Sequence, residues 1–251
     1  MTPNGMLFDY GGTLVEEVSV DLRAGNEWLL SRASYRPPHV TIDHVVERAA
    51  RVAREVTSRR DEVHIETPWP TLTRLIHDFL GIRFDMPMAD LELGFWNASV
   101  HTQAMPGARE ALEQFHKWGL PLAVVSNTGF GEPVIRHELA RYGLTDHLAF
   151  VLVSSDYSVR KPNVLLYETA AARLNVKAED IWFVGDRLDT DVAGAKAAGM
   201  TAVWFNPQGR ANPSRDANAS RDVDLTVSGW ADLVGHVGPP GAVNGPSEQS
   251  Y

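Results

Sequence analysis

Cysteine is absent from the 251-residue chain, which excludes disulfides, thiol nucleophiles and thiolate metal sites. No apolar run approaches the roughly 20 residues that a membrane-spanning helix needs, so no membrane partner is expected. The opening residues MTPNGMLFDY lack the basic region and long apolar segment of a secretory signal, which predicts a cytoplasmic location. The net charge is -9 and the sequence has no sizeable basic block, which argues against nucleic acid as the main partner.

Residues 16–103 contain mainly helical patterns. Within 41–60, arginines lie largely opposite an apolar face with helical spacing, formed by Ile42, Val45, Val46, Ala49, Val52, Ala53 and Val56. Segments 71–82 and 89–100 look similar, and proline-containing segments at 34–39 and 66–70 separate the helices. We therefore predict a helical domain over residues 16–103, inserted into a larger domain.

From residue 106 onward, helical and strand-like patterns alternate. Short apolar runs typical of buried strands occur at 120–125, 148–155, 180–186 and 201–206. Helical segments precede or separate them at 106–119, 132–143, 163–176 and 191–199. This alternation predicts an α/β fold, a doubly wound parallel sheet built from residues 1–15 and 104–236. The tail 237–251 is rich in Gly, Pro and Ser, and we expect it to be disordered.

Polar side chains stand where predicted strands end. Asp9 ends the first strand, Ser126 and Asn127 end the second, Asp186 ends a later one, and Lys161 directly precedes a helix. Parallel sheets bind ligands at the carboxyl ends of their strands, so these residues should meet in one crevice. Asp9 and Asp186 suit Mg²⁺, which prefers oxygen ligands, whereas a lysine and a serine hydroxyl suit a phosphate group.

Four segments resemble, in order, the four motifs of the haloacid dehalogenase-like (HAD) superfamily. DYGGTL at 9–14 is similar to motif one, VVSNT at 124–128 to motif two, VRKPN at 159–163 to motif three, and VGDRLDTDVAGAKAAG at 184–199 to motif four. The resemblance covers roughly residues 6–206. It points to the subgroup in which a helical cap lies between motifs one and two, here residues 16–103.

The resemblance implies phosphoryl-transfer roles for the strand-end residues. Asp9 would be the nucleophile that forms an aspartyl-phosphate. Mg²⁺ would be held by Asp9, Asp186 and the backbone carbonyl of Gly11. Ser126 and Asn127 would bind the phosphoryl group of a small phosphorylated metabolite.

Motifs one, three and four add further residues through the same resemblance. Lys161 would pair with the phosphoryl group and with Asp9, and Asp191 would orient that lysine. Gly12 and Thr13 would shape the turn at the phosphate. Asp189 and Asp191 also have a structural interpretation, because an Asp in such a position often caps the helix that follows. For Asp189, the site role and the helix cap carry equal weight.

Gly11 is the main departure from the family pattern. Most family phosphatases have a second Asp there, which protonates the leaving oxygen and later activates the attacking water. Positioned acid–base catalysis is worth roughly 10²–10⁴-fold, so the loss predicts a barrier about 3 to 5 kcal/mol higher for a poor leaving group. Glu16 is the first substitute, although a hinge or surface role is favoured for it; Glu17, Asp21 and His64 are weaker candidates. An acyl or enol phosphate has a good leaving group, so a substrate of that kind would not need the missing acid.

Other activities fit less well. Residues 15–104 contain no lysine, which nearly excludes a phosphonatase with a Schiff-base lysine in its cap. A mutase needs the second Asp, and a dehalogenase does not need the acid-rich motif four. A Mg²⁺-dependent phosphatase is therefore expected, with a catalytically weak binder of a phosphorylated ligand or a protein partner as the alternative. Monomer and homodimer both remain open.

The predicted cap also contains arginines and tryptophans. A solvated helix face is favoured over contact with a second substrate anion for Arg48, Arg51, Arg54, Arg59 and Arg60. Trp69 and Trp96 are expected in a core rather than in a substrate pocket.

Overall fold

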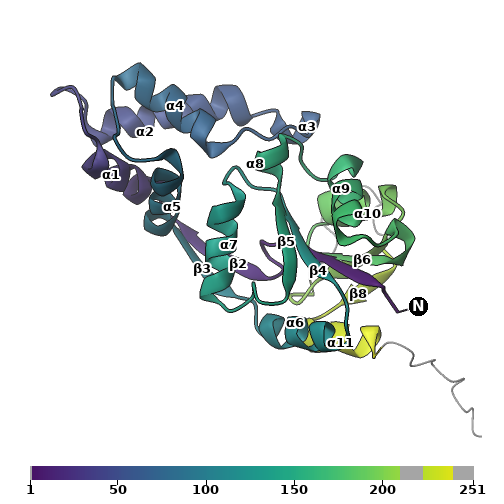
Figure 1. Ribbon diagram of the computed structural model, residues 1–251. Helices are drawn as coiled ribbons and strands as arrows, with labels where there is room; N and C mark the ends of the chain where they lie inside the picture. The colour runs from purple at the N-terminus through teal and green to yellow at the C-terminus, as the bar shows by residue number, and fades with distance from the viewer. Residues whose placement is uncertain (1, 210–222, 240–251) are drawn as a thin grey trace, which may run out of the picture.

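The computed structural model describes residues 2–209 and 223–239. Its centre is a sheet with strand order β5-β4-β1-β6-β7-β8, in which every neighbouring pair is parallel (Figure 1). The strands are β1 Gly5–Phe8, β4 Leu122–Ser126, β5 Leu148–Val153, β6 Ile181–Gly185, β7 Thr201–Phe205 and β8 Leu225–Val227. The predicted doubly wound α/β fold is confirmed, and β8 is an edge strand that the sequence patterns did not reveal.

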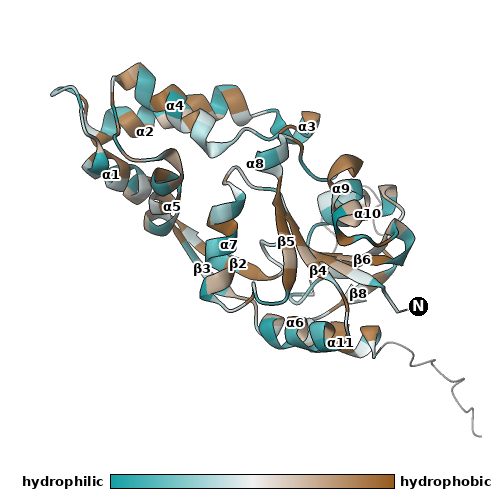
Figure 2. Ribbon diagram, in the orientation of Figure 1, coloured by the Kyte–Doolittle hydropathy of each residue, from teal (hydrophilic) through white to brown (hydrophobic). Residues whose placement is uncertain are grey.

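Helices cover both faces of this sheet. In β1, Met6 and Phe8 belong to one apolar core and Leu7, between them, belongs to the other. The first core includes residues of α6 Ala108–Lys117, α7 Glu132–Arg141 and α11 Trp230–Val237. The second includes residues of α9 Val164–Leu174 and α10 Ala193–Ala197. Burial on both faces explains the continuous apolar runs of the strands, brown in Figure 2.

Residues 21–99 are mostly helical. Their helices are α1 Leu22–Arg32, α2 Ile42–Val52, α3 Arg60–Val63, α4 Trp69–Leu80 and α5 Met88–Ser99, and α2 continues into a wider turn at Ala53–Thr57. Two apolar clusters hold these helices together: one centres on Val45 and Ile76, and the other on Leu29 and Phe95. The apolar face expected within 41–60 is buried against α4 over the length of α2, whereas Ala53 and Val56 beyond it are exposed.

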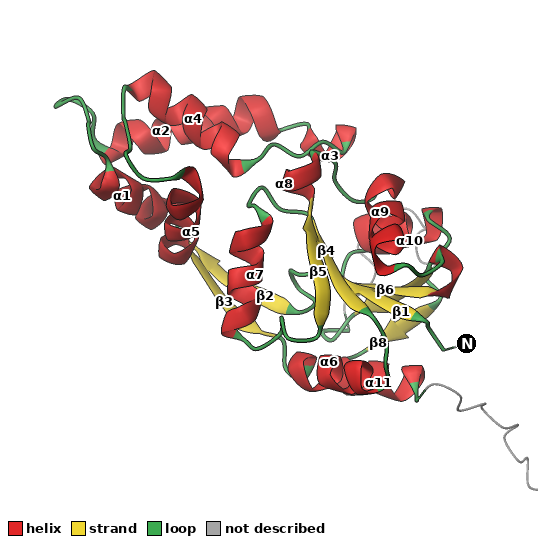
Figure 3. Cartoon of the chain, in the orientation of Figure 1, coloured by secondary structure: helices red, strands yellow, loops and turns green. Residues whose placement is uncertain are grey.

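Two strands connect this segment to the sheet. β2 Val15–Val20 and β3 Val100–Ala104 pair as an antiparallel ribbon, yellow in Figure 3. The segment 16–103, expected to be mainly helical, thus also contains most of one strand at its start and most of another at its end. Only the first residue of β2 is buried, so the strand lacks the alternating buried positions that would have signalled it.

The two tryptophans expected in a core are buried. Trp69 is 8% exposed and its ring centroid lies 5.1 Å from that of Phe95, whereas Trp96 is 2% exposed and belongs to a core of the main sheet. Among residues 2–209 and 223–239, no helix has the length and apolar character to cross a membrane. The predicted tail overlaps α11, which ends at Val237; residues 240–251 lie outside the described residues.

Candidate active site

The ammonium group of Lys161 lies in a buried cluster at the carboxyl ends of the strands. Its Nζ donates to Asp9 Oδ1 at 2.5 Å, to Asp191 Oδ1 at 2.7 Å and to the carbonyl of Val125 at 2.9 Å. These contacts use all three donors of the ammonium group. Asp9 is 7% exposed, Lys161 3% and Asp191 1%, so the ion pairs are shielded from water.

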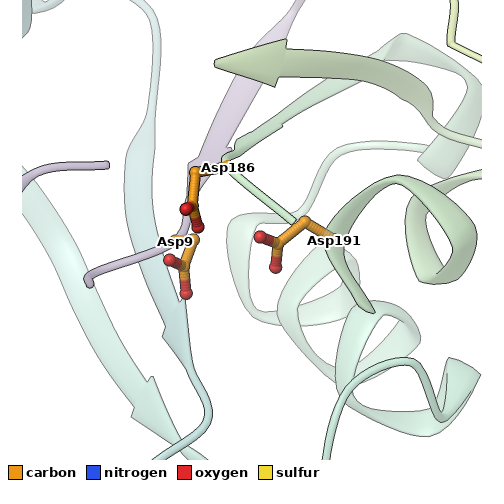
Figure 4. A group of neighbouring side chains, drawn as sticks. All are labelled: Asp9, Asp186 and Asp191. Atoms are coloured by element: carbon orange, nitrogen blue, oxygen red, sulfur yellow. The ribbon is translucent and has the colours of Figure 1, made fainter. Parts of the chain in front are cut away.

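Asp186 brings a third carboxylate to this cluster. One ligand oxygen from each of Asp9, Asp186 and Asp191 can be chosen so that all lie within 4.8 Å of one another (Figure 4). Three carboxylates thus lie close together at the carboxyl ends of β1 and β6 and beside Lys161. Carboxylate oxygens at this spacing suit a hard divalent cation such as Mg²⁺.

Burial controls the charge state of the cluster. Desolvation raises the pKa of Asp9 to about 7, even though Lys161 acts in the opposite direction. Desolvation also works against the charge on Lys161, but Asp191 and Asp9 outweigh it and raise the pKa of the ammonium group. A divalent cation would lower the cost of ionising Asp9, because a nearby positive charge favours the carboxylate form.

Backbone contacts hold the lysine and its partner in place. Asn127 Oδ1 accepts from the backbone N–H of Lys161 at 2.7 Å, and its Nδ2 donates to the Lys161 carbonyl at 3.0 Å. Asp191 Oδ2 accepts from the backbone N–H of Arg187 at 3.1 Å. Asn127 thus uses both ends of its amide to fix the loop that carries Lys161, which is a positioning contact.

The loop after β1 is shaped by its two glycines. Gly12 has a φ of +74°, and a Cβ there would lie 2.7 Å from a carboxylate oxygen of Asp186. A Cβ at Gly11 would meet no atom within 4 Å, so the position has room for a side chain. Thr13 is fully buried below the turn. The missing carboxylate at position 11 is therefore not a consequence of crowding.

A cleft of about 470 Å³ opens above the cluster. Of the residues singled out in the sequence, its lining includes Asp9, Gly11, Ser126, Asn127, Lys161, Asp189 and Asp191. Gly12, Thr13 and Asp186 are not part of that lining, although Asp186 belongs to the carboxylate cluster. Asp189 lies at the cleft but is paired with Arg187 at 2.8 Å.

The four candidates for the missing acid differ in whether they line the cleft. Glu16 accepts a hydrogen bond from Gln103 Nε2 at 2.7 Å and does not line the cleft. Asp21 caps α1 by accepting from a backbone N–H, whereas Glu17 and His64 line the cleft. Desolvation raises the pKa of Glu17. Because successive side chains of a strand point to opposite faces, the two neighbouring glutamates of β2 differ in access to the cleft.

Most of the five arginines between residues 48 and 60 are exposed, as the sequence led us to expect. Arg51 and Arg59 form ion pairs with exposed glutamates three or four residues along the chain. Arg48 lies 3.8 Å above the ring of Phe79. Arg60 differs, because it lines the cleft.

A buried ion pair that the sequence did not suggest joins the inserted segment to the core loop beside Lys161. Glu66, 2% exposed, pairs with Arg160, 7% exposed, and also accepts from Ser154 Oγ at 2.8 Å. Arg160 makes a second ion pair with the exposed Asp61 at 3.1 Å. The backbone N–H of Arg160 donates to the carbonyl of His64 at 2.9 Å, so the two chain segments are bound together next to the cluster.

This chain is similar in sequence and fold to known phosphatases. Ribulose-1,5-bisphosphate 5-phosphatase of Halopiger xanaduensis is 31% identical over 144 residues, which cover 56% of this chain and 59% of that relative. The crystal structure of a HAD phosphatase from Thermococcus onnurineus matches with a TM-score of 0.64 and 25% identity, covering 94% of this chain and 98% of that one.

A dehalogenase has the same fold. The structure of 2-haloacid dehalogenase from Pseudomonas syringae pv. Tomato DC3000 matches with a TM-score of 0.62 and 24% identity, covering 93% of this chain and 96% of that one. The model of the haloacid dehalogenase-like hydrolase family matches residues 3–199, which include the cluster of Asp9, Lys161 and Asp191. The chain thus belongs to the haloacid dehalogenase-like hydrolase family.

Proposed function

We propose that the protein is a Mg²⁺-dependent phosphatase of a small phosphorylated metabolite, with Asp9 as the nucleophile. The observation that carries the proposal is the buried contact of Lys161 with Asp9 and Asp191 at the floor of the cleft. A lysine held there by two carboxylates remains charged and can neutralise a transferring phosphoryl group. The phosphatases among the relatives support the same reaction class.

Two steps complete the proposed reaction. A carboxylate oxygen of Asp9 bonds to phosphorus while the bond from phosphorus to the leaving oxygen breaks, and that oxygen takes a proton. Water then bonds to the phosphorus of the aspartyl-phosphate and loses a proton, while the bond from phosphorus to the Asp9 oxygen breaks. Inorganic phosphate leaves, and the Asp9 carboxylate is restored. Lys161 stabilises the phosphoryl oxygens in both steps, and Asp191 keeps Lys161 in position.

Asp9, Asp186 and the carbonyl of Gly11 would hold the magnesium ion beside the phosphoryl group. When bound, Mg²⁺ supplies positive charge to the phosphoryl oxygens and lowers the cost of keeping Asp9 ionised. The spacing of the carboxylate oxygens of the cluster supports this assignment.

Glu17 is our proposed source of the proton in place of the missing Asp. Its position in the lining of the cleft carries this assignment, and desolvation raises its pKa, the direction that a proton donor needs. Glu16 provides a matched control, because it is the adjacent residue of the same strand and does not line the cleft. We expect Glu17→Gln to lower kcat on alkyl phosphates about 100-fold or more and to affect aryl phosphates less. Glu16→Gln should leave both rates near wild type; equal effects of the two variants would contradict the assignment.

The test of the function is Mg²⁺-dependent phosphate release from aryl, alkyl, sugar and acyl phosphates, with Asp9→Asn as the control. Turnover that disappears in Asp9→Asn is the expected result. Turnover near wild type in that variant would overturn the role of Asp9. Release of halide from a 2-haloacid without metal would support the dehalogenase alternative, and phosphate binding without any turnover would support the binding alternative.

A further inference from the structure

The inserted segment contains a second cavity, of about 430 Å³, outside the catalytic cleft. Its lining is predominantly apolar and comes from α1, α2, α4, α5 and the loop after β4; it includes Val46, Ala49, Leu72, Ile76, Phe95 and Phe130. Both the volume and the apolar lining are typical of sites for small organic molecules. Leu22 also lines it and is 60% exposed, so the cavity reaches the surface.

The cavity and the catalytic cleft are neighbours. Arg60 lines both spaces. The loop after β4 also serves both, because Thr128 lines the cleft and the next residue, Gly129, lines the cavity. The backbone N–H of Trp69 donates to the carbonyl of Gly129 at 2.7 Å, which holds this loop against the cavity wall. The two spaces are therefore adjacent, and Arg60 and the loop after β4 form the wall that they share.

Polar side chains also line the cavity, among them Arg23, Asn26, Thr73 and His77. His77 is 4% exposed, and both of its ring nitrogens are fully buried, so they do not face the open space. The apolar walls therefore determine what the cavity can bind.

We propose that this cavity binds the apolar part of the substrate, an alkyl or aryl group, while the phosphate lies in the cleft. This assignment of a substrate class rests on the proposed phosphatase function. The apolar walls contribute affinity by removing the hydrocarbon from water.

Filling the cavity tests the proposal with little risk to folding. Ala53 lines the cavity from an exposed position at the end of α2, so Ala53→Phe adds a ring there without disturbing a buried core. Ala89, exposed on α5 and outside the cavity lining, gives the matched control Ala89→Phe. The substrates are hexyl phosphate and methyl phosphate, compared by kcat/KM.

The wild type and Ala89→Phe should prefer hexyl over methyl phosphate at least tenfold, and Ala53→Phe should bring that ratio near one. A ratio near one in the wild type, or an unchanged ratio in Ala53→Phe, would overturn the proposal.

A second readout needs no turnover. Binding of 1-hexanol, measured by ligand-observed NMR, should be saturable in the wild type and in Ala89→Phe and weakened at least tenfold in Ala53→Phe. Absence of turnover with every phosphate ester would overturn the phosphatase function. Absence of saturable 1-hexanol binding would overturn the cavity assignment, so the two failures are distinguishable.

Discussion

Acid should destabilise the folded protein through His77 in particular. Burial lowers the pKa of His77 to about 4, and the opposing charge of Asp78 does not offset this. In the unfolded chain an imidazole has a pKa near 6.5, so the unfolded state takes up the proton first as the pH falls. The stability due to neutral His77 is therefore complete above pH 7 and is lost as the pH falls from 6.5 through about 4.

The size of this effect follows from the separation of the two pKa values. At 1.36 kcal/mol per pKa unit, the loss relative to pH 7 amounts to roughly 2 kcal/mol at pH 5 and roughly 3 kcal/mol at pH 4. Screening by solvent reduces these figures little, because the side chain is 4% exposed.

Urea unfolding followed by tryptophan fluorescence at pH 7 and pH 5 measures the effect. His77→Gln removes the titrating group, and His39→Gln is the matched control at an exposed histidine. From pH 7 to pH 5, wild type should lose roughly 2 kcal/mol more free energy of unfolding than His77→Gln and the same amount as His39→Gln. Equal losses in wild type and His77→Gln would refute the reasoning.

Three further outcomes are expected. Gly11→Asp, which enters open space, should raise kcat on alkyl phosphates at least tenfold more than on aryl phosphates, and equal gains would contradict the role of the missing acid. Glu66→Gln should lower the free energy of unfolding by about 3 kcal/mol because Arg160 stays buried, whereas Glu62→Gln, at an exposed pair, should cost under about 1 kcal/mol; similar losses would exclude a special role for the buried pair. Mg²⁺ should raise the Tm of the wild type and not of Asp186→Asn, and EDTA should abolish turnover; an equal rise in both proteins would place the ion elsewhere.

The strand-end residues were predictable because their positions depend on a regular feature. A strand buried on both faces reads as a continuous apolar run, so the sequence reveals where β1, β4 and β6 end. In a parallel sheet those ends share one edge, and this is why Asp9 and Asp186 were expected to meet. Lys161 was expected there because it directly precedes a helix, and the motif resemblance added Asp191, whose position no strand pattern reveals.

Other features depend on tertiary packing and were missed. Glu16 was preferred to Glu17 because β2, with one buried residue, gave no sign of the strand that turns them to different faces. The buried pair of Glu66 and Arg160 joins residues 94 positions apart. The cavity beside His77 exists only because several helices pack around it, and a lone histidine in an amphipathic helix does not indicate such a space.

The paired ribbon of β2 and β3 also makes the inserted segment a removable unit. The two connections between this segment and the sheet lie on adjacent strands, and Val15 is paired directly with Ala104. Paired antiparallel residues are about 5 Å apart, a gap that a hairpin turn of two to five residues spans. A short turn in place of the whole segment therefore leaves the order of the six strands unchanged. The insertion can change in length and sequence during evolution while the buried cluster beneath it stays the same.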